Sequence, residues 1–122
     1  MSGYVTNIER ETIRNGDFRR VLYTGPNIQL VLMTLQPRED IGLEVHRDHD
    51  QFIRVETGTG VAVLDGEDSA LIDGTAVVIP AGVEHNVINT SPDKPLRLYT
   101  LYSPPEHPQG TVHRTKRDAE TA

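Results

Sequence analysis

The sequence contains no cysteine and no tryptophan, and aromatic residues make up only 5% of it. Without cysteine the chain forms no disulfide and supplies no thiolate metal ligand or thiol nucleophile, which excludes those chemistries. The absence is compatible with a reducing compartment. Apolar residues reach 36%, a low share that is concentrated in short runs of valine, isoleucine and leucine. These runs can build a core, but none is long enough to span a bilayer.

Length and charge narrow the function classes further. A chain of 122 residues predicts one domain over residues 1–122, with a core at about 18–103 and a C-terminal arm at about 104–122. The formal net charge of −6 argues against a nucleic-acid backbone or an anionic membrane surface as a partner. Residues 1–16 are charged and lack an apolar segment, which predicts no signal peptide and a cytoplasmic location.

Short runs with a period of two dominate the chain, and Gly, Pro, Asp and Asn separate them. No segment shows a convincing helical period. This pattern predicts an all-β barrel or sandwich, and the residues after about Pro104 are expected to form an arm or a frayed tail. The predicted strands lie at residues 18–24, 28–35, 41–47, 51–57, 61–64, 69–72, 75–79, 84–89 and 96–102.

Two of these runs allow a prediction of which face is buried. In 96–102 the set Leu96, Leu98, Thr100 and Tyr102 is more apolar than the alternate set, so we expect it to face the interior. In 28–35 both faces are apolar. That predicts a strand covered on both sides, with a subunit partner as one source of the cover.

Four side chains have the chemistry of metal ligands. Glu44 and His46 are two residues apart on a predicted strand and therefore share a face. Gln51 begins the next strand after a short turn, and His85 arrives from a separate strand. One carboxylate, two imidazoles and one amide oxygen suit Fe(II), Mn(II), Ni(II), Co(II) or Zn(II), with positions left for water or substrate.

Other interpretations of these residues stay open. Glu44 and His46 also fit the solvated face of an edge strand, and His49 in the following turn is an alternative ligand in place of Glu44. The Pro80-x-Gly82 turn favours a site, because such a rigid corner has little reason to precede His85 unless that side chain must be aimed. The remaining histidines, in the C-terminal arm, are interpreted as surface residues that have some chance of capping a pocket: His107 and His113.

The segment GTAVVIPAGVEHNVIN at residues 74–89 resembles the second motif of the cupin family, G-x5-P-x-G-x2-H-x3-N. Every position of that motif is matched, by Gly74, Pro80, Gly82, His85 and Asn89. The first cupin motif, G-x5-H-x-H-x3-4-E-x6-G, is matched in part. The chain has His46 at the second His and the closing Gly58, but Glu44 at the first His and Gln51 at the Glu.

The resemblance covers roughly residues 28–102 and implies a single-domain antiparallel β-barrel of the jelly-roll type, often a homodimer. It also implies a metal held by Glu44, His46, Gln51 and His85. Because the carboxylate only changes position within this set, the formal charge of the ligands is unchanged and a divalent transition metal is still expected. Its identity among Mn, Fe, Zn and Ni stays open.

Function is less determined than fold, because cupins carry many activities. We expect a metal-dependent enzyme of the isomerase, lyase or dioxygenase type that acts on a small polar metabolite. Tyr102 and His49 are the candidate catalytic groups for proton transfer. Two alternatives remain, a non-catalytic module that binds or senses a small ligand or sugar and a cupin whose metal is purely structural.

Overall fold

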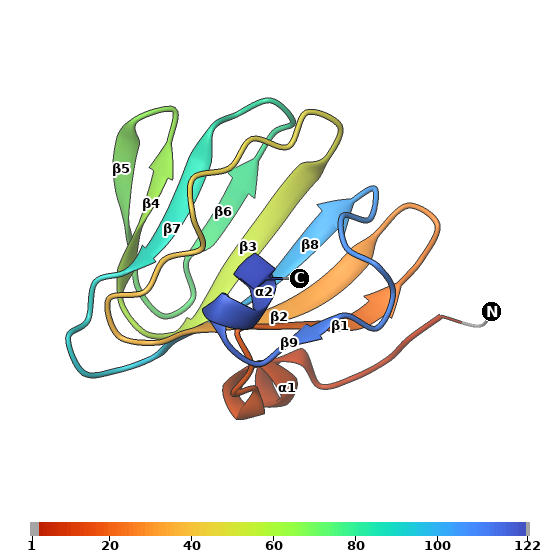
Figure 1. Ribbon diagram of the computed structural model, residues 1–122, viewed down its shortest axis with the longest axis horizontal. Helices are drawn as coiled ribbons and strands as arrows, with labels where there is room; N and C mark the ends of the chain where they lie inside the picture. Colours follow the sequence, from red (N-terminus) through yellow and green to blue (C-terminus); the bar gives the residue numbers. More distant parts are fainter. Residues whose placement is uncertain (1–2, 122) are drawn as a thin grey trace.

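A computed structural model describes residues 3–121 of the chain, and strands account for most of its regular structure (Figure 1). Two short helices lie near the two ends of the chain. The elements are α1 (Ile8–Arg14), β1 (Arg19–Thr24), β2 (Gln29–Leu35), β3 (Asp50–Thr57), β4 (Gly60–Leu64), β5 (Glu67–Leu71), β6 (Ala76–Ile79), β7 (His85–Asn89), β8 (Leu96–Ser103), β9 (Val112–His113) and α2 (Lys116–Thr121).

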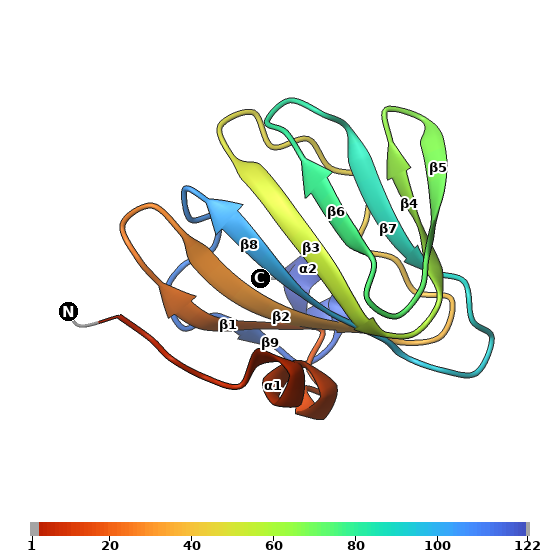
Figure 2. The same ribbon diagram turned by 180° about the vertical axis from the view of Figure 1, so that it is seen from behind.

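The strands form two antiparallel sheets, one of six strands in the order β6-β3-β8-β2-β1-β9 and one of three in the order β5-β4-β7. The prediction of an antiparallel all-β fold is confirmed. Within residues 3–121 no ladder between named strands joins the two sheets into a continuous barrel, and the arrangement is consistent with a jelly roll. Figures 1 and 2 show α1 at the lower end of the six-stranded sheet and α2 across one of its faces.

Burial along β8 follows the predicted alternation. Leu96, Leu98, Thr100 and Tyr102 are buried, and the residues between them are half-buried. This strand lies between β2 and β3 in the large sheet and pairs with both of them along most of its length. Its inward side chains therefore join the one hydrophobic core of the described structure.

Strand β2 is buried on both faces, as its composition predicts. Helix α1 supplies part of the cover from within the same chain. It contacts β2, β3 and β8, and Asn15 at its C-terminal cap donates to Thr34 Oγ1 and accepts from it through the backbone carbonyl. A subunit partner is therefore not required to explain the burial of Thr34, and the homodimer stays a prediction.

The expectation that the chain has no helix is wrong for α1 and α2. Helix α1 has only seven residues, too few to display a hydrophobic period. Its signals are local: the Asn7 side chain accepts from the Arg10 backbone, acidic residues follow in the first turn, and Arg14 ends the helix. None of the helices in residues 3–121 has the length and apolar composition needed to cross a membrane.

The C-terminal arm forms regular structure within residues 112–121, so the alternative of a frayed tail is wrong for this part. Strand β9 pairs with β1, and the buried Gln29 side chain binds the arm through its amide. Gln29 Oε1 accepts from the backbone of Glu106 and His107, and Gln29 Nε2 donates to the His107 carbonyl. A single buried amide thus holds residues 106–107 against the large sheet.

The predicted strand at 41–47 is replaced by an extended segment with isolated bridges. Asp40 bridges Ile88 and Glu44 bridges His85, both antiparallel. Gly42 between the bridging positions has a φ of 110°, a conformation that only glycine adopts readily and that interrupts a regular ladder. The segment nevertheless runs along β7, which places its side chains beside those of the small sheet.

Asn89, the last residue of the second motif, has a structural role. Its side chain is buried and donates to the carbonyls of Leu35, Gln36 and Lys94, and it accepts from the Ser91 backbone at 2.9 Å. These contacts fasten the loop before β8 to the end of β2. The motif therefore contains one residue that holds loops as well as one that faces the interior.

We predict that Asn89→Ala lowers the free energy of unfolding by about 2–4 kcal/mol, because it leaves buried carbonyls without donors. Asn27→Ala is the matched control, since Asn27 is exposed in a turn and its change should stay within about 0.5 kcal/mol. Urea unfolding of both variants measures the difference. Equal stability of the two variants would show that Asn89 is not a structural anchor.

Candidate metal centre

The corner before His85 is joined to the segment that carries His46. Gly82 has a φ of 89°, and the Val83 backbone donates to the Pro80 carbonyl at 3.2 Å to close the turn. The Gly82 backbone donates to the His46 carbonyl at 2.8 Å. The corner thus fixes the start of β7 and the position of His46 at the same time.

Glu44 and His85 form a reciprocal backbone pair. The Glu44 backbone N–H donates to the His85 carbonyl at 2.9 Å, and the His85 N–H donates to the Glu44 carbonyl at 2.9 Å. Residues opposite each other in such a pair direct their side chains to the same face. The two side chains are therefore held together although they lie far apart in sequence.

Three of the four predicted ligands come together as a cluster. The ligand atoms of Glu44, His46 and His85 all lie within 4.8 Å of one another. His46 Nε2 is 3.6 Å from Glu44 Oε2, and the centroids of the two imidazole rings are 5.2 Å apart. Such spacing suits donors around one cation.

The hydrogen bond of His85 determines which of its nitrogens is free. His85 Nδ1 lies 2.9 Å from the Val83 carbonyl, which can only accept, so Nδ1 carries the proton. Nε2 then has a lone pair, and it is buried with no hydrogen-bond partner in residues 3–121. His46 Nε2 is likewise buried and without a hydrogen bond there.

Gln51, the fourth predicted ligand, is buried on β3. Its Nε2 donates to Thr100 Oγ1 at 3.0 Å, which orients the amide. Its Oε1 is buried and accepts no hydrogen bond within the described residues. The carbonyl oxygen of Gln51 is therefore an unused acceptor in the interior.

Three residues thus leave ligand-type atoms buried without partners, and a carboxylate lies beside two of them. A buried polar atom without a partner costs about 1–3 kcal/mol, and native structures contain few of them. A divalent cation held between His46 and His85 would satisfy both imidazoles, and an amide oxygen such as that of Gln51 is also among its usual ligands. The donor set therefore fits a metal ion.

Glu106 is a residue of this site that sequence reasoning missed. Its Oε2 lies 3.1 Å from His46 Nδ1 and 3.0 Å from His49 Nε2. Neither contact has the alignment of a hydrogen bond, so Glu106 is in close contact with both rings without a hydrogen bond to either. A carboxylate behind a metal-binding imidazole is a recurrent arrangement that orients the ring. Glu106 lies in the arm, and no sequence pattern connects it to His46.

His49 occupies a different position from the cluster. Its ring contacts Glu106, and its centroid lies 5.8 Å from that of His46. Among the described residues the cluster contains Glu44 and not His49. The geometry therefore favours Glu44 over the alternative ligand and places His49 behind the cluster.

Tyr102 is buried beside the cluster. Its ring meets His46 edge-on with centroids 5.8 Å apart, and it meets His107 in the same way at 5.3 Å. Burial, together with the negative charge of Glu44, raises the pKa of Tyr102 well above its usual range. The phenol therefore stays protonated at neutral pH and can act there as a hydrogen-bond donor but not as a base.

A cavity of about 390 Å³ opens beside Glu44, a volume within the range of small-molecule sites. His107 and His113 line it, so their interpretation as ordinary surface residues is wrong and their capping role is supported. Helix α2 contributes three of its lining residues. The lining residues are Phe18, Arg19, Ile41, Gly42, Glu44, His107, His113, Lys116, Ala119 and Glu120.

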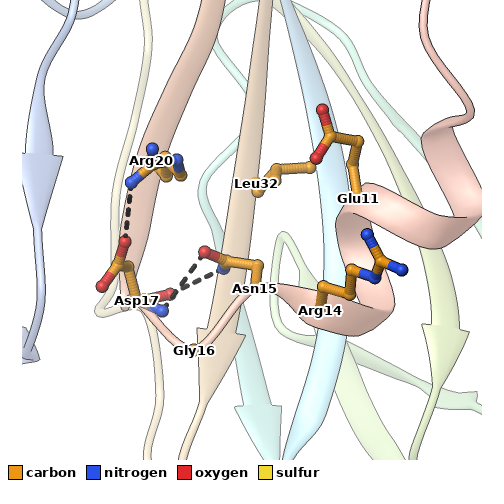
Figure 3. Close-up of a pocket in the computed structure, with 7 residues that line it drawn as sticks. All are labelled: Glu11, Arg14, Asn15, Gly16, Asp17, Arg20 and Leu32. Carbon is orange, nitrogen blue, oxygen red and sulfur yellow. Dashed lines mark hydrogen bonds and ion pairs between the residues drawn. The ribbon is translucent and has the colours of Figure 1, made fainter.

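A second pocket, shown in Figure 3, lies where α1 meets β1 and has a volume of about 170 Å³. Its main polar contact is the ion pair between Arg20 and Asp17 at 3.2 Å. None of the clustered ligands lines it. This pocket is therefore separate from the candidate metal centre.

Comparison with known proteins agrees with this geometry. A family model described as a cupin domain matches residues 31–102. The uncharacterized protein YrkC of Bacillus subtilis (strain 168) is 48% identical over 98% of this chain and 67% of its own length. The crystal structure of BH2720 from Bacillus halodurans is 49% identical, has a TM-score of 0.95, and covers 98% of this chain and 94% of that one. KdgF from Halomonas sp. is 26% identical, with a TM-score of 0.67 over 72% of this chain and 78% of that one.

The environment of His107 predicts a pH dependence of stability. Burial and the positive charge of Arg19 lower the pKa of His107 to about 3, against about 6.5 in the unfolded chain. Between about pH 3 and pH 6.5 the unfolded state binds a proton at His107 and the folded state does not. The contribution of neutral His107 to the free energy of unfolding is therefore complete above pH 6.5 and is lost as the pH falls towards 3.

We predict that, when the pH is lowered from 7 to 5, the free energy of unfolding falls less in His107→Gln than in the wild type. Urea unfolding at both pH values measures the two differences. If acidification weakens both proteins equally, the depressed pKa of His107 is wrong.

Proposed function

The chain belongs to the cupin domain family, and from that premise we propose that it binds one divalent transition-metal ion through Glu44, His46, Gln51 and His85. The observation that carries this proposal is the set of buried, unpartnered atoms His46 Nε2, Gln51 Oε1 and His85 Nε2. The mixed nitrogen and oxygen donors, with no sulfur, suit Mn, Fe, Zn or Ni.

The proposed activity is that of a metal-dependent enzyme acting on a small polar metabolite. Four protein ligands would leave open positions on a six-coordinate ion such as Mn or Fe but not on tetrahedral Zn, and the cavity of about 390 Å³ beside Glu44 offers room for a substrate. When bound, such an ion supplies Lewis-acid polarisation of a carbonyl or hydroxyl oxygen. Isomerase, lyase and dioxygenase chemistry all fit this description.

The side chains around the proposed metal have roles in positioning a ligand, donating a hydrogen bond and transferring a proton. Glu106 positions the His46 ring, because its carboxylate lies 3.1 Å from the nitrogen that faces away from the cluster. Tyr102, kept protonated by burial, can donate a hydrogen bond to an oxygen that gains negative charge. His49 shares the carboxylate of Glu106, so it can accept or release a proton through that group.

A non-catalytic module that binds a small ligand is the second candidate function. One observation favours it: Tyr102 is held protonated, and His49 lies against Glu106. Neither of these two candidate groups is therefore a free base beside the cluster. Incubation of metal-loaded protein with a mixture of small metabolites distinguishes the two, since an enzyme changes their NMR spectra and a binding module does not.

We predict that the wild type, purified without added ions, contains about one equivalent of metal and that His85→Ala loses it. The strands supply the core, so the variant should keep its fold. His49→Ala is the matched control and should retain the metal, because His49 lies outside the cluster. Elemental analysis and circular dichroism give the two measurements. A His85→Ala variant that keeps full metal content would refute the site.

A double substitution tests the ligand assignment from the opposite direction. Glu44→His together with Gln51→Glu moves the carboxylate within the set and adds an imidazole, so we predict retained metal with a preference shifted towards Ni and Cu. Competition between metals, followed by elemental analysis, measures the preference. Complete loss of metal from a folded variant would show that these two residues are not ligands.

A further inference from the structure

Arg19 on β1 is a buried cation that the proposed metal site does not use. The residue is only 8% exposed, and its guanidinium lies 5.3 Å from the centroid of the Phe18 ring. Within residues 3–121 its side chain makes one hydrogen-bond contact, between Nη1 and His113 Nδ1 at 3.2 Å. Its Nε is buried without a partner. At least one of its five donors is therefore buried and unused.

No carboxylate of the described residues forms an ion pair with Arg19, whereas the other cation of the same cavity is neutralised. Lys116 pairs with Asp40. Arginine stays protonated under all physiological conditions, and a buried charge without a counter-ion destabilises a fold. Arg19 thus has no ion-pair partner among the described residues, and an anionic ligand in the cavity could provide one.

The position of Arg19 connects this charge to the candidate metal centre. Arg19 and Glu44 both line the cavity of about 390 Å³, and the charges of both act on Tyr102. His107 lies in the same lining with a buried, unpartnered Nε2. A ligand in the cavity would therefore meet a guanidinium, an imidazole nitrogen and the neighbourhood of the proposed metal.

We infer that this cavity binds the carboxylate of a small organic acid, with Arg19 as the anion-binding residue and His107 as a second polar contact. The inference deepens the proposed function and rests on it for the role of the metal, which would face another oxygen of the same acid. A carboxylate fits the planar fork of arginine. Each carboxylate brings one negative charge to the guanidinium, and a second carboxylate of the same acid is left to face the neighbourhood of Glu44 and the proposed metal.

The test compares binding of malonate by metal-loaded wild type and Arg19→Met, measured by calorimetry and thermal shift. Methionine keeps the length of the side chain and removes its charge. We expect the dissociation constant for malonate to rise at least about tenfold, since a hydrogen bond to a charged group contributes more than that factor. The neutral analogue malonamide should bind neither protein.

The melting temperature of unliganded Arg19→Met distinguishes an anion-binding role of Arg19 from a structural one. Removal of an uncompensated buried charge should leave the melting temperature unchanged or raise it, whereas an arginine needed to hold β9 would lower it. Arg20→Met is the matched control. It changes the neighbouring arginine, which lies in the pocket of Figure 3, and should bind malonate like the wild type.

Measurements on metal-free protein separate this inference from the metal proposal. Metal-free wild type should still bind malonate, but more weakly than the metal-loaded wild type does. Metal-free Arg19→Met should bind malonate more weakly than metal-free wild type. Equal binding by wild type and Arg19→Met, or no binding by wild type in either state, would overturn the inference. Tighter binding of inorganic phosphate than of malonate would overturn the assignment to carboxylates.

Discussion

The reciprocal backbone pair between Glu44 and His85 is the constraint on which the site depends. Two hydrogen bonds of 2.9 Å fix an extended segment against β7 and set two side chains on one face. Gly82 adds a bond to the His46 carbonyl, so the corner that opens β7 also holds the third member of the cluster. The geometry of the ligand atoms therefore follows from backbone pairing between segments that are far apart in sequence.

The C-terminal arm adds residues to the site that the strands position. Gln29 on β2 holds residues 106–107 through three hydrogen bonds, and this anchoring brings Glu106 to the rings of His46 and His49. The same arm carries β9 and α2, which contribute residues to the lining of the cavity beside the cluster. The arm thus pairs with β1 at the edge of the large sheet and also places Glu106 beside the candidate metal centre.

The interior retains polar atoms that a structure built for stability alone would have paired. His46, Gln51 and His85 each leave a buried atom without a hydrogen bond in the described residues, and Arg19 leaves its Nε in the same state. Each such atom costs stability. The atoms of His46 and His85 belong to one cluster, and Arg19 lines the cavity beside it. This proximity is the physical reason for assigning function to this region, since ligand binding would satisfy them.

Local sequence determined most of the strands of the two sheets and the buried face of β8. Alternation placed Thr100 and Tyr102 inside, and the second motif predicted the corner before His85, because turn chemistry and strand period act over a few residues. Helix α1 was too short to show a period, and the pairing of Glu44 with His85 and the approach of Glu106 were decided by tertiary structure alone. Such contacts join residues far apart in the chain, and no local spacing encodes which segments meet when the sheets pack.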